Sequence, residues 1–200
     1  AYGAECGARD LQAAEACGGD LDQHVATRFS RGCHLMHALA FFGQIEALEC
    51  LLGGGREANA KDCDGYAPLH MAARAGHEAA AVLLISHGAS AVAASCHTRS
   101  TPLHRAAYAG HACVVSLLLH HSAPIETRDS DGWTPLHCAA LRGHEAVVRL
   151  MLASGVGQCE RADACRAAAS SGFRAVAGLL RAGTGADKLQ EEEAEEEDCE

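Results

Sequence analysis

Histidine and cysteine are the residues of this chain whose numbers could support chemistry, since its 200 residues include 13 histidines and 11 cysteines. Imidazole nitrogens and thiolates bind zinc, and a thiolate beside a base can act as a nucleophile. A structural zinc site needs closely spaced ligand pairs, and no Cys-x-x-Cys sequence occurs. Because the remaining groupings lack that spacing, we predict no metal site and no cofactor. These groupings are Cys96-His97, His120-His121 and the pair Cys159 and Cys165.

Motifs of catalysis are missing from the sequence as well. It has no G-x-S-x-G, no H-E-x-x-H, no glycine-rich phosphate loop and no kinase-type H-R-D run. We expect Cys33 and Cys63 to be exposed, but no base is placed to activate either thiol. We therefore predict no catalytic residue and a chain that is not an enzyme.

The cysteines and the hydropathy indicate where the chain resides. An odd number of cysteines, scattered from Cys6 to Cys199, favours reduced thiols over a disulfide framework. We interpret Cys50 and Cys138 as small hydrophobic residues. No stretch reaches the ~20 apolar residues of a membrane span, and the N-terminus lacks a basic region followed by an apolar one. We expect a cytoplasmic or nuclear location.

The net charge of −10 is concentrated at one end of the chain. Residues 191–200 hold eight acidic residues, which leaves 18 acidic against 16 basic residues in the rest. A nearly neutral body gives no support for nucleic-acid binding. We expect residues 184–200 to be a disordered acidic tail that aids solubility. The alternatives are that it binds a basic partner or folds back on Arg74, Arg128 and Arg142.

The elements that must position the histidines repeat along the chain. Pro-Leu-His occurs at residues 68–70, 102–104 and 135–137. Proline suits the first position of a helix because it has no N–H, and Thr134 can cap the helix at Pro135 by accepting a backbone N–H. One short helix cannot bury its apolar face alone. A period near 33 residues therefore predicts a stack of similar units.

Most of the histidines belong to this repeat, in the Leu-His pair or directly after a turn glycine. The histidines at these two positions are His37, His70, His104 and His137, and then His77, His111 and His144. The turn glycines are Gly43, Gly76, Gly110, Gly143 and Gly172. A second helix follows each glycine, with apolar residues at the fourth, seventh and eighth positions after it. We expect these helices to end in left-handed caps near Gly55, Gly88, Ser122, Gly155 and Gly183.

The repeat resembles the ankyrin repeat family, whose consensus reads D-x-x-G-x-T-P-L-H-x-A-A-x-x-G-H and then V-V-x-L-L-L-x-x-G-A. The match is strong for residues 62–94 and 129–156, good for 96–123 and weaker for 31–61, which lack the Thr-Pro. The resemblance covers residues 31–183 and implies an all-α ankyrin-repeat solenoid of about five, or six, helix-turn-helix units with finger loops. It also implies that the Leu-His histidines hydrogen-bond within the turn and to the neighbouring unit.

We divide the chain into three parts on this basis. Residues 1–30 form an N-terminal helix or a degenerate capping repeat, residues 31–183 the array, and residues 184–200 the tail. The units lie near 31–61, 62–95, 96–128, 129–160 and 161–183.

Two units depart from the consensus. Ala67 replaces the capping threonine of the second unit, which should cost its first helix about 1 kcal/mol. In the third unit Cys96 replaces the leading aspartate and Arg99 the turn glycine, so we expect a distorted finger.

The resemblance implies a non-enzymatic protein–protein interaction module, which acts as a scaffold, adaptor or inhibitor through its concave surface of fingers and inner helices. Tyr, Trp and Arg dominate binding energy at interfaces, and the chain places several of them at family contact positions. The predicted partner-binding residues are Phe41, Phe42, Tyr66, Arg74, Ser100, Tyr108, Arg128, Ser130, Trp133, Leu141 and Arg142. We predict one or more protein partners, no nucleic acid, no membrane, and a monomer.

Three alternatives remain. Tyr66 and Trp133 can instead pack on the adjacent finger, while Phe41 and Phe42 can seal a junction with the N-terminal segment. The chain can also be a targeting or regulatory segment of a larger multidomain enzyme, which the absence of an initiator methionine permits. Asn59 occupies a finger position that asparaginyl hydroxylases modify in some members of the family, or it serves turn geometry.

Overall fold

The computed structural model describes residues 35–182, which form ten α-helices and no strand. The predictions for residues 1–30 and 184–200 lie outside these described residues. The helices follow one another in five pairs, each joined by a short turn at a glycine. The pairs are α3 (Leu35–Phe42) with α4 (Ile45–Gly53), α5 (Pro68–Ala75) with α6 (Glu78–Ser86), α7 (Pro102–Ala109) with α8 (Ala112–His120), α9 (Pro135–Arg142) with α10 (Glu145–Ala153), and α11 (Gln158–Ser170) with α12 (Arg174–Ala182).

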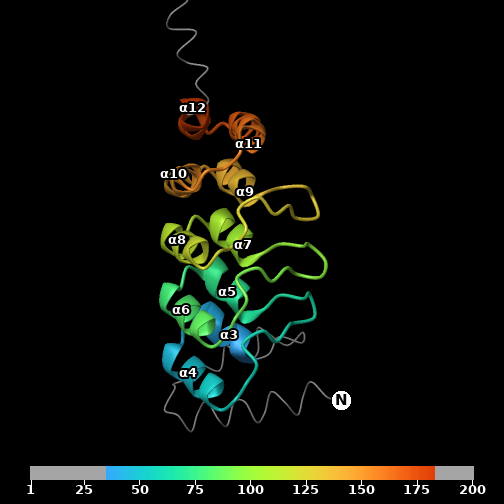
Figure 1. Ribbon diagram of the computed structural model, residues 1–200, viewed down its shortest axis with the longest axis vertical. Helices are drawn as coiled ribbons and strands as arrows, with labels where there is room; N and C mark the ends of the chain where they lie inside the picture. The colour runs from blue at the N-terminus through green and yellow to red at the C-terminus, as the bar shows by residue number, and fades with distance from the viewer. Residues whose placement is uncertain (1–34, 183–200) are drawn as a thin grey trace, which may run out of the picture.

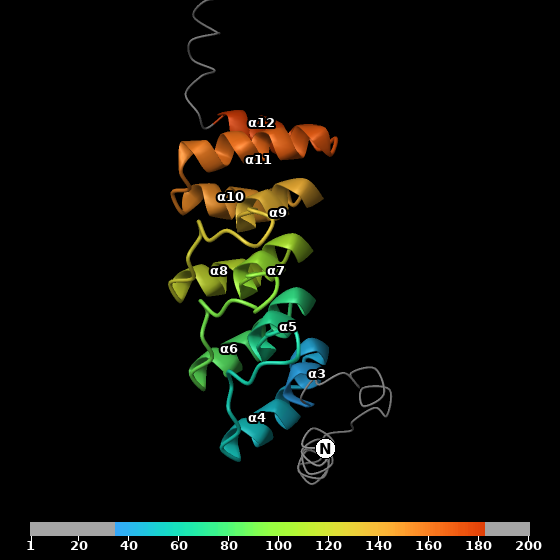
Figure 2. The ribbon, with the colours of Figure 1, turned by 90° about the vertical axis from the view of Figure 1, so that its right-hand side faces the viewer.

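The pairs stack in chain order into an elongated solenoid, which confirms the predicted fold class (Figure 1). The first helices of successive pairs pack on one another, as do the second helices, and the main contacts join adjacent pairs (Figure 2). We call the first helices, α3, α5, α7, α9 and α11, the inner helices. Loops that precede α5, α7 and α9 project on the inner-helix side as fingers (Figure 1).

The Leu-His histidine closes the N-terminus of its own inner helix. Thr134 and His137 contact each other at the start of α9, as Thr101 and His104 do at α7, but neither threonine side chain makes a capping hydrogen bond to the helix backbone, so the predicted Thr134 cap was wrong. At α9 the Thr134 N–H donates to His137 Nδ1 across 3.3 Å, and the Thr134 hydroxyl lies 2.7 Å from the same nitrogen. At α5, where Ala67 has no hydroxyl, the Ala67 N–H still donates to His70 Nδ1 across 3.0 Å. Nδ1 is therefore the acceptor nitrogen of these rings.

The other ring nitrogen ties each unit to the next one. Because a carbonyl oxygen only accepts, Nε2 carries the proton and donates it to the backbone carbonyl just before the next inner helix begins. The bond to the next unit is the one that the family resemblance implied, and a ring that also accepts at Nδ1 must be neutral with its proton on Nε2. The three bonds run from His37 to Tyr66 O (2.8 Å), from His70 to Ser100 O (3.1 Å) and from His104 to Trp133 O (3.1 Å).

Burial keeps these imidazoles neutral. Desolvation lowers the pKa of His70 from 6.5 to about 4, and it also lowers the pKa of His104 and of His137. At neutral pH each of these rings therefore has one donor nitrogen and one acceptor nitrogen.

The histidines that follow the turn glycines form a second set of bridges, which run backward. His111 Nε2 donates to the carbonyl of Arg74 across 3.2 Å, and His144 Nε2 donates to that of Tyr108 across 3.0 Å. Each ring lies directly over the turn glycine of the preceding unit. A Cβ atom on Gly110 would meet His144 Nδ1 at 2.5 Å, so only glycine leaves room for the ring.

The second helices confirm the predicted face with one addition. In every unit the fourth and eighth residues after the turn glycine are buried, while the seventh is half-buried. The fifth residue, absent from the predicted stripe, is buried as well. These fifth residues are Leu48, Ala81, Val115, Val148 and Ala177. The predicted turn glycines all have positive φ, as do the predicted cap residues Gly55, Gly88, Ser122 and Gly155; Gly183 lies outside the described residues.

The third finger is one residue longer than its neighbours rather than disrupted. Ser95, not Cys96, takes the place of the leading aspartate, because Ser95 N–H donates to Ser100 O across 3.0 Å and its hydroxyl accepts from Ser100 N–H. We number the fingers by their units, so that the second, third and fourth fingers precede α5, α7 and α9. In the second finger the equivalent bonds join Asp62 and Tyr66. The extra residue is accommodated with Arg99 at φ 52°.

The cysteines largely keep free thiols. Six of the seven described cysteines are free, but Cys50 is disulfide-bonded, so the prediction of reduced thiols was wrong at that position. Cys138 is buried in the core, and burial raises the pKa of its thiol to about 12. Cys138 therefore behaves as the small hydrophobic residue that the sequence predicts.

We expect acid to destabilise the array through the Leu-His histidines. Between pH 6.5 and about 4 the unfolded chain binds a proton at residue 70 that the folded chain excludes, so the free energy of unfolding falls as the pH is lowered through this window. The fall should be about 1.4 kcal/mol per pH unit for this residue alone. Urea unfolding at pH 7.5 and pH 5.5 measures it. His70→Asn should show a shallower pH dependence, and the exposed His87→Asn an unchanged one; equal slopes in all three would contradict the mechanism.

Gly110→Ala and Gly155→Ala form a matched pair. Both glycines have left-handed backbones, with φ of 84° and 85°, so either alanine costs about 1 to 2 kcal/mol of strain. Only Gly110 carries a neighbour's ring over it, whereas nothing lies within 4 Å of a Cβ at Gly155. We expect Gly110→Ala to cost at least ~1 kcal/mol more, because His144 must leave its bond. Thermal unfolding compares the two, and equal losses would refute this role for His144.

Candidate protein-binding surface

The predicted partner-binding residues at the inner-helix ends form a row of exposed and half-buried side chains, which we call the inner-helix ridge. It consists of Phe41 and Phe42 on α3, Arg74 on α5, Tyr108 on α7, and Leu141 and Arg142 on α9. Each lies one or two residues before a turn glycine, so the stacking of the units brings them into line. Phe42 is 36% and Tyr108 49% exposed, and the two phenylalanine rings meet edge to face.

Tyr108 and Arg142 form the closest contact within the ridge. The Arg142 guanidinium lies 4.8 Å from the centroid of the Tyr108 ring, a cation–π contact between neighbouring units. The Tyr108 carbonyl accepts the hydrogen bond from His144, and the Arg74 carbonyl accepts the one from His111. The backward histidine bridges therefore fix the backbone from which these exposed side chains project.

Tyr66 lies inside the array rather than on its surface. It is only 8% exposed, and its hydroxyl contacts Thr98 Oγ1 at 2.9 Å and accepts from Arg105. The Arg105 guanidinium also lies 4.4 Å from the ring centroid. These contacts favour the alternative in which Tyr66 packs on the adjacent finger.

Ser100 is also an interior residue, with 7% of its surface exposed. Its carbonyl accepts from His70, and its N–H closes the third finger. Tyr66 and Ser100 are therefore left out of the surface that we propose for a partner.

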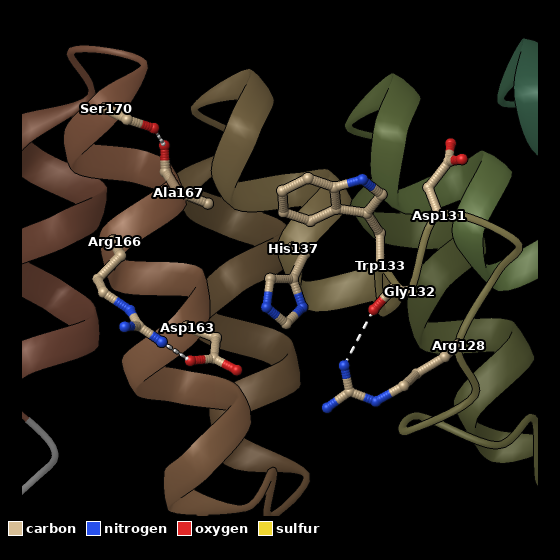
Figure 3. A pocket seen from close by; sticks show the side chains of 9 residues that line it. All are labelled: Arg128, Asp131, Gly132, Trp133, His137, Asp163, Arg166, Ala167 and Ser170. Atoms are coloured by element: carbon tan, nitrogen blue, oxygen red, sulfur yellow. Dashed lines mark hydrogen bonds and ion pairs between the residues drawn. The ribbon is translucent and has the colours of Figure 1, made fainter.

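Arg128 and Trp133 of the fourth finger line a pocket of about 480 Å³ between this finger and α11 (Figure 3). Trp133 is half-buried, packs against the core and meets the His137 ring edge to face at 5.4 Å between centroids. Arg128 donates to Gly132 O across 3.0 Å and approaches Glu160 at 3.5 Å. Ser130 is exposed, while its N–H donates to Thr98 O of the preceding finger across 2.9 Å. Trp133 thus serves the fold and also lines a cavity.

Sequence reasoning missed two residues. Val92 is 56% exposed in the third finger, although a valine in an alanine-rich loop gave no signal of its own. Arg105 is half-buried against Tyr66, and its position directly after a Leu-His histidine could have indicated contact with the preceding finger. Val92 adds an exposed apolar side chain to the third finger, and Arg105 packs on the buried Tyr66.

Asn59 joins two units. Its amide nitrogen donates to Gly88 O across 2.8 Å, and its amide oxygen accepts from Ser90 N–H across 2.8 Å. Both ends of the side chain are therefore used within the array, which favours the turn-geometry alternative.

The chemistry that this surface offers is recognition. Among residues 35–182 no three His, Cys, Asp or Glu side chains are grouped to hold a metal ion. In the same part of the chain, no helix is sufficiently long and apolar to span a membrane. Aromatic rings, guanidinium groups and small polar side chains instead share one face of the stack. Such a set of side chains suits contact with another protein.

Comparison with known families agrees with this architecture. The family model described as ankyrin repeats (3 copies) matches residues 35–129, 90–163 and 115–192. Together these matches cover more than half of the chain, and they include every helix pair that the structure describes.

Proposed function

Because this chain belongs to the ankyrin repeat family, we propose that it is a non-enzymatic scaffold, adaptor or inhibitor that holds a protein partner on its inner-helix ridge and fingers. Ankyrin repeats are generally protein–protein interaction modules and typically lack catalytic activity. The proposed contact residues are the six of the ridge together with Val92, Arg128, Ser130 and Trp133. We also propose a monomer in the cytoplasm or nucleus, which the six free thiols favour.

The observation that carries the proposal is the exposed pair Tyr108 and Arg142. Tyrosine and arginine are enriched among the residues that dominate binding energy, and a half-exposed ring beneath a guanidinium offers both apolar area and charge. The backbone beneath Tyr108 is held by His144, so the ring needs little ordering when a partner binds. An anchor that is rigid and still exposed before binding is what a preformed interface requires.

We expect Tyr108→Ala and Arg142→Ala each to weaken partner binding at least ~10-fold, which corresponds to about 1.4 kcal/mol. Both side chains are exposed, so the unfolding midpoint should change little. Affinity capture with quantitative mass spectrometry, followed by titration of the captured protein, measures the effect. Trp133→Ala is less informative, because Trp133 packs against the core and its loss would also destabilise the array.

The matched control is Val82→Ala on α6. Val82 is 47% exposed, close to the 49% of Tyr108, but it lies on a second helix away from the ridge. We expect Val82→Ala to retain partners at the wild-type level. If Tyr108→Ala and Arg142→Ala retained the same proteins with the same affinities, the ridge would not be the binding surface.

A further inference from the structure

The junction between the fourth and fifth described helix pairs leaves one imidazole donor without a protein acceptor. At the three junctions before it, Nε2 of the Leu-His histidine donates to the carbonyl that precedes the next inner helix. His137 has the same Nδ1 contacts with Thr134, so its proton also lies on Nε2. Among the described residues, however, no group accepts from His137 Nε2, and the largely buried ring lines an open pocket.

The reason is that the fifth unit has no finger. Residues 121–134 separate α8 from α9, whereas only residues 154–157 separate α10 from α11. When Gly143 is aligned with Gly172, Ala162 corresponds to Trp133. Ala162 lies inside α11, so its carbonyl is committed to the helix's own hydrogen bonds. The fifth unit therefore has no finger carbonyl that could accept from His137.

The positions at which α9 begins correspond to positions inside α11. Asp163 and Arg166 occupy the positions of Thr134 and of the Leu-His histidine, and their side chains form an ion pair. Both point toward the pocket that Trp133, His137 and Arg128 line from the opposite side (Figure 3). Where the array otherwise holds a finger, this junction holds an open space of about 480 Å³.

We propose that this pocket binds an extended peptide segment of a protein partner, which takes the place of the missing finger and presents a backbone carbonyl to His137 Nε2. The inference rests on the proposed function, since the segment comes from a bound protein. A backbone carbonyl fills the equivalent position at each of the three other junctions, so the site is built for that group.

The charges of the pocket favour a peptide over an anion. Arg128 and Arg166 bring two positive charges, but Asp131 and Asp163 bring two negative ones. Glu160, which approaches Arg128 at 3.5 Å, adds a third negative charge. A carboxylate-rich segment such as residues 184–200 would meet this repulsion, whereas the neutral amides of a peptide backbone would not.

The experiment uses the full chain and a synthetic peptide with the sequence of residues 124–134, its own fourth finger. In the array this segment gives His104 its acceptor through the carbonyl of Trp133. We expect the peptide to shift the imidazole NMR signals of His137 saturably. It is titrated to about 2 mM, because a short peptide loses conformational entropy when it becomes ordered on binding and therefore binds weakly. His137→Asn keeps an amide oxygen near the Nδ1 position but has no Nε2 donor. It should bind the peptide at least ~10-fold more weakly and unfold close to the wild-type midpoint.

Three further variants separate the pocket from the fold and from the ridge. Ser170→Trp, at an exposed site on the pocket rim, should block the peptide without touching His137. His104→Asn should lower the unfolding midpoint, because its Nε2 bond is satisfied in the native array, and Tyr108→Ala should leave peptide binding unchanged.

Several results would overturn the inference. If the His137 signals did not move, water would be the acceptor. Wild-type affinity for the peptide in both His137→Asn and Ser170→Trp would also contradict the inference. If the peptide bound only after residues 184–200 were deleted, the pocket would belong to the chain's own C-terminal segment. If the peptide does not bind while Tyr108→Ala still weakens partner binding, the pocket inference is wrong and the proposed function stands.

Discussion

The hydrogen bond from a buried, neutral imidazole to the backbone of the next unit is the interaction on which the stack depends. A pair of eight- or nine-residue helices cannot bury its apolar face alone, so each unit needs its neighbour. His70 meets two demands at once, since Nδ1 caps its own helix and Nε2 reaches the third finger. A protonated ring would lose the acceptor, and a lysine or glutamine could not provide both geometries. Burial therefore does more than exclude water, because it also holds the ring in the one protonation state that works.

The backward bridges connect this framework to recognition. His111 and His144 hold the carbonyls of Arg74 and Tyr108, and those residues carry side chains of the ridge. The histidine positions are the same in consecutive units, while the ridge side chains change from phenylalanine to arginine, tyrosine and leucine. The array thus fixes a row of backbone positions and leaves the side chains there free to vary. In Arg74 and Tyr108 the backbone carbonyl stabilises the stack, while the side chain belongs to the ridge.

The sequence period predicted the helices and turns within each unit but not the side-chain contacts between neighbouring units. Pro-Leu-His and the turn glycines placed the starts of α5, α7 and α9 and their left-handed C-caps correctly, because helix start and stop signals are local. The buried fifth position of the second helices was missed, since it faces an adjacent unit about 33 residues away. Tyr66 was predicted to contact a partner because the sequence of one unit does not show its contacts with the next. The structure places Arg105 against its ring and Thr98 against its hydroxyl. The third finger was misaligned by one residue, because serine can replace aspartate in closing it.

The C-terminal junction shows why a repeat protein reveals most where its repeat fails. An array must end, and here the fifth unit replaces the finger with a longer α11 and the glycine-following histidine with Phe173, which packs on Gly143. Phe173 keeps the ring contact on the glycine of the preceding unit and gives up the backward hydrogen bond that a histidine would make. His137 did not make the corresponding trade, although a leucine there would have left no polar atom to satisfy. Among the junctions that the structure describes, this is the one whose Leu-His donor has no acceptor within the array, so an acceptor from outside the array would be stabilised most at this place.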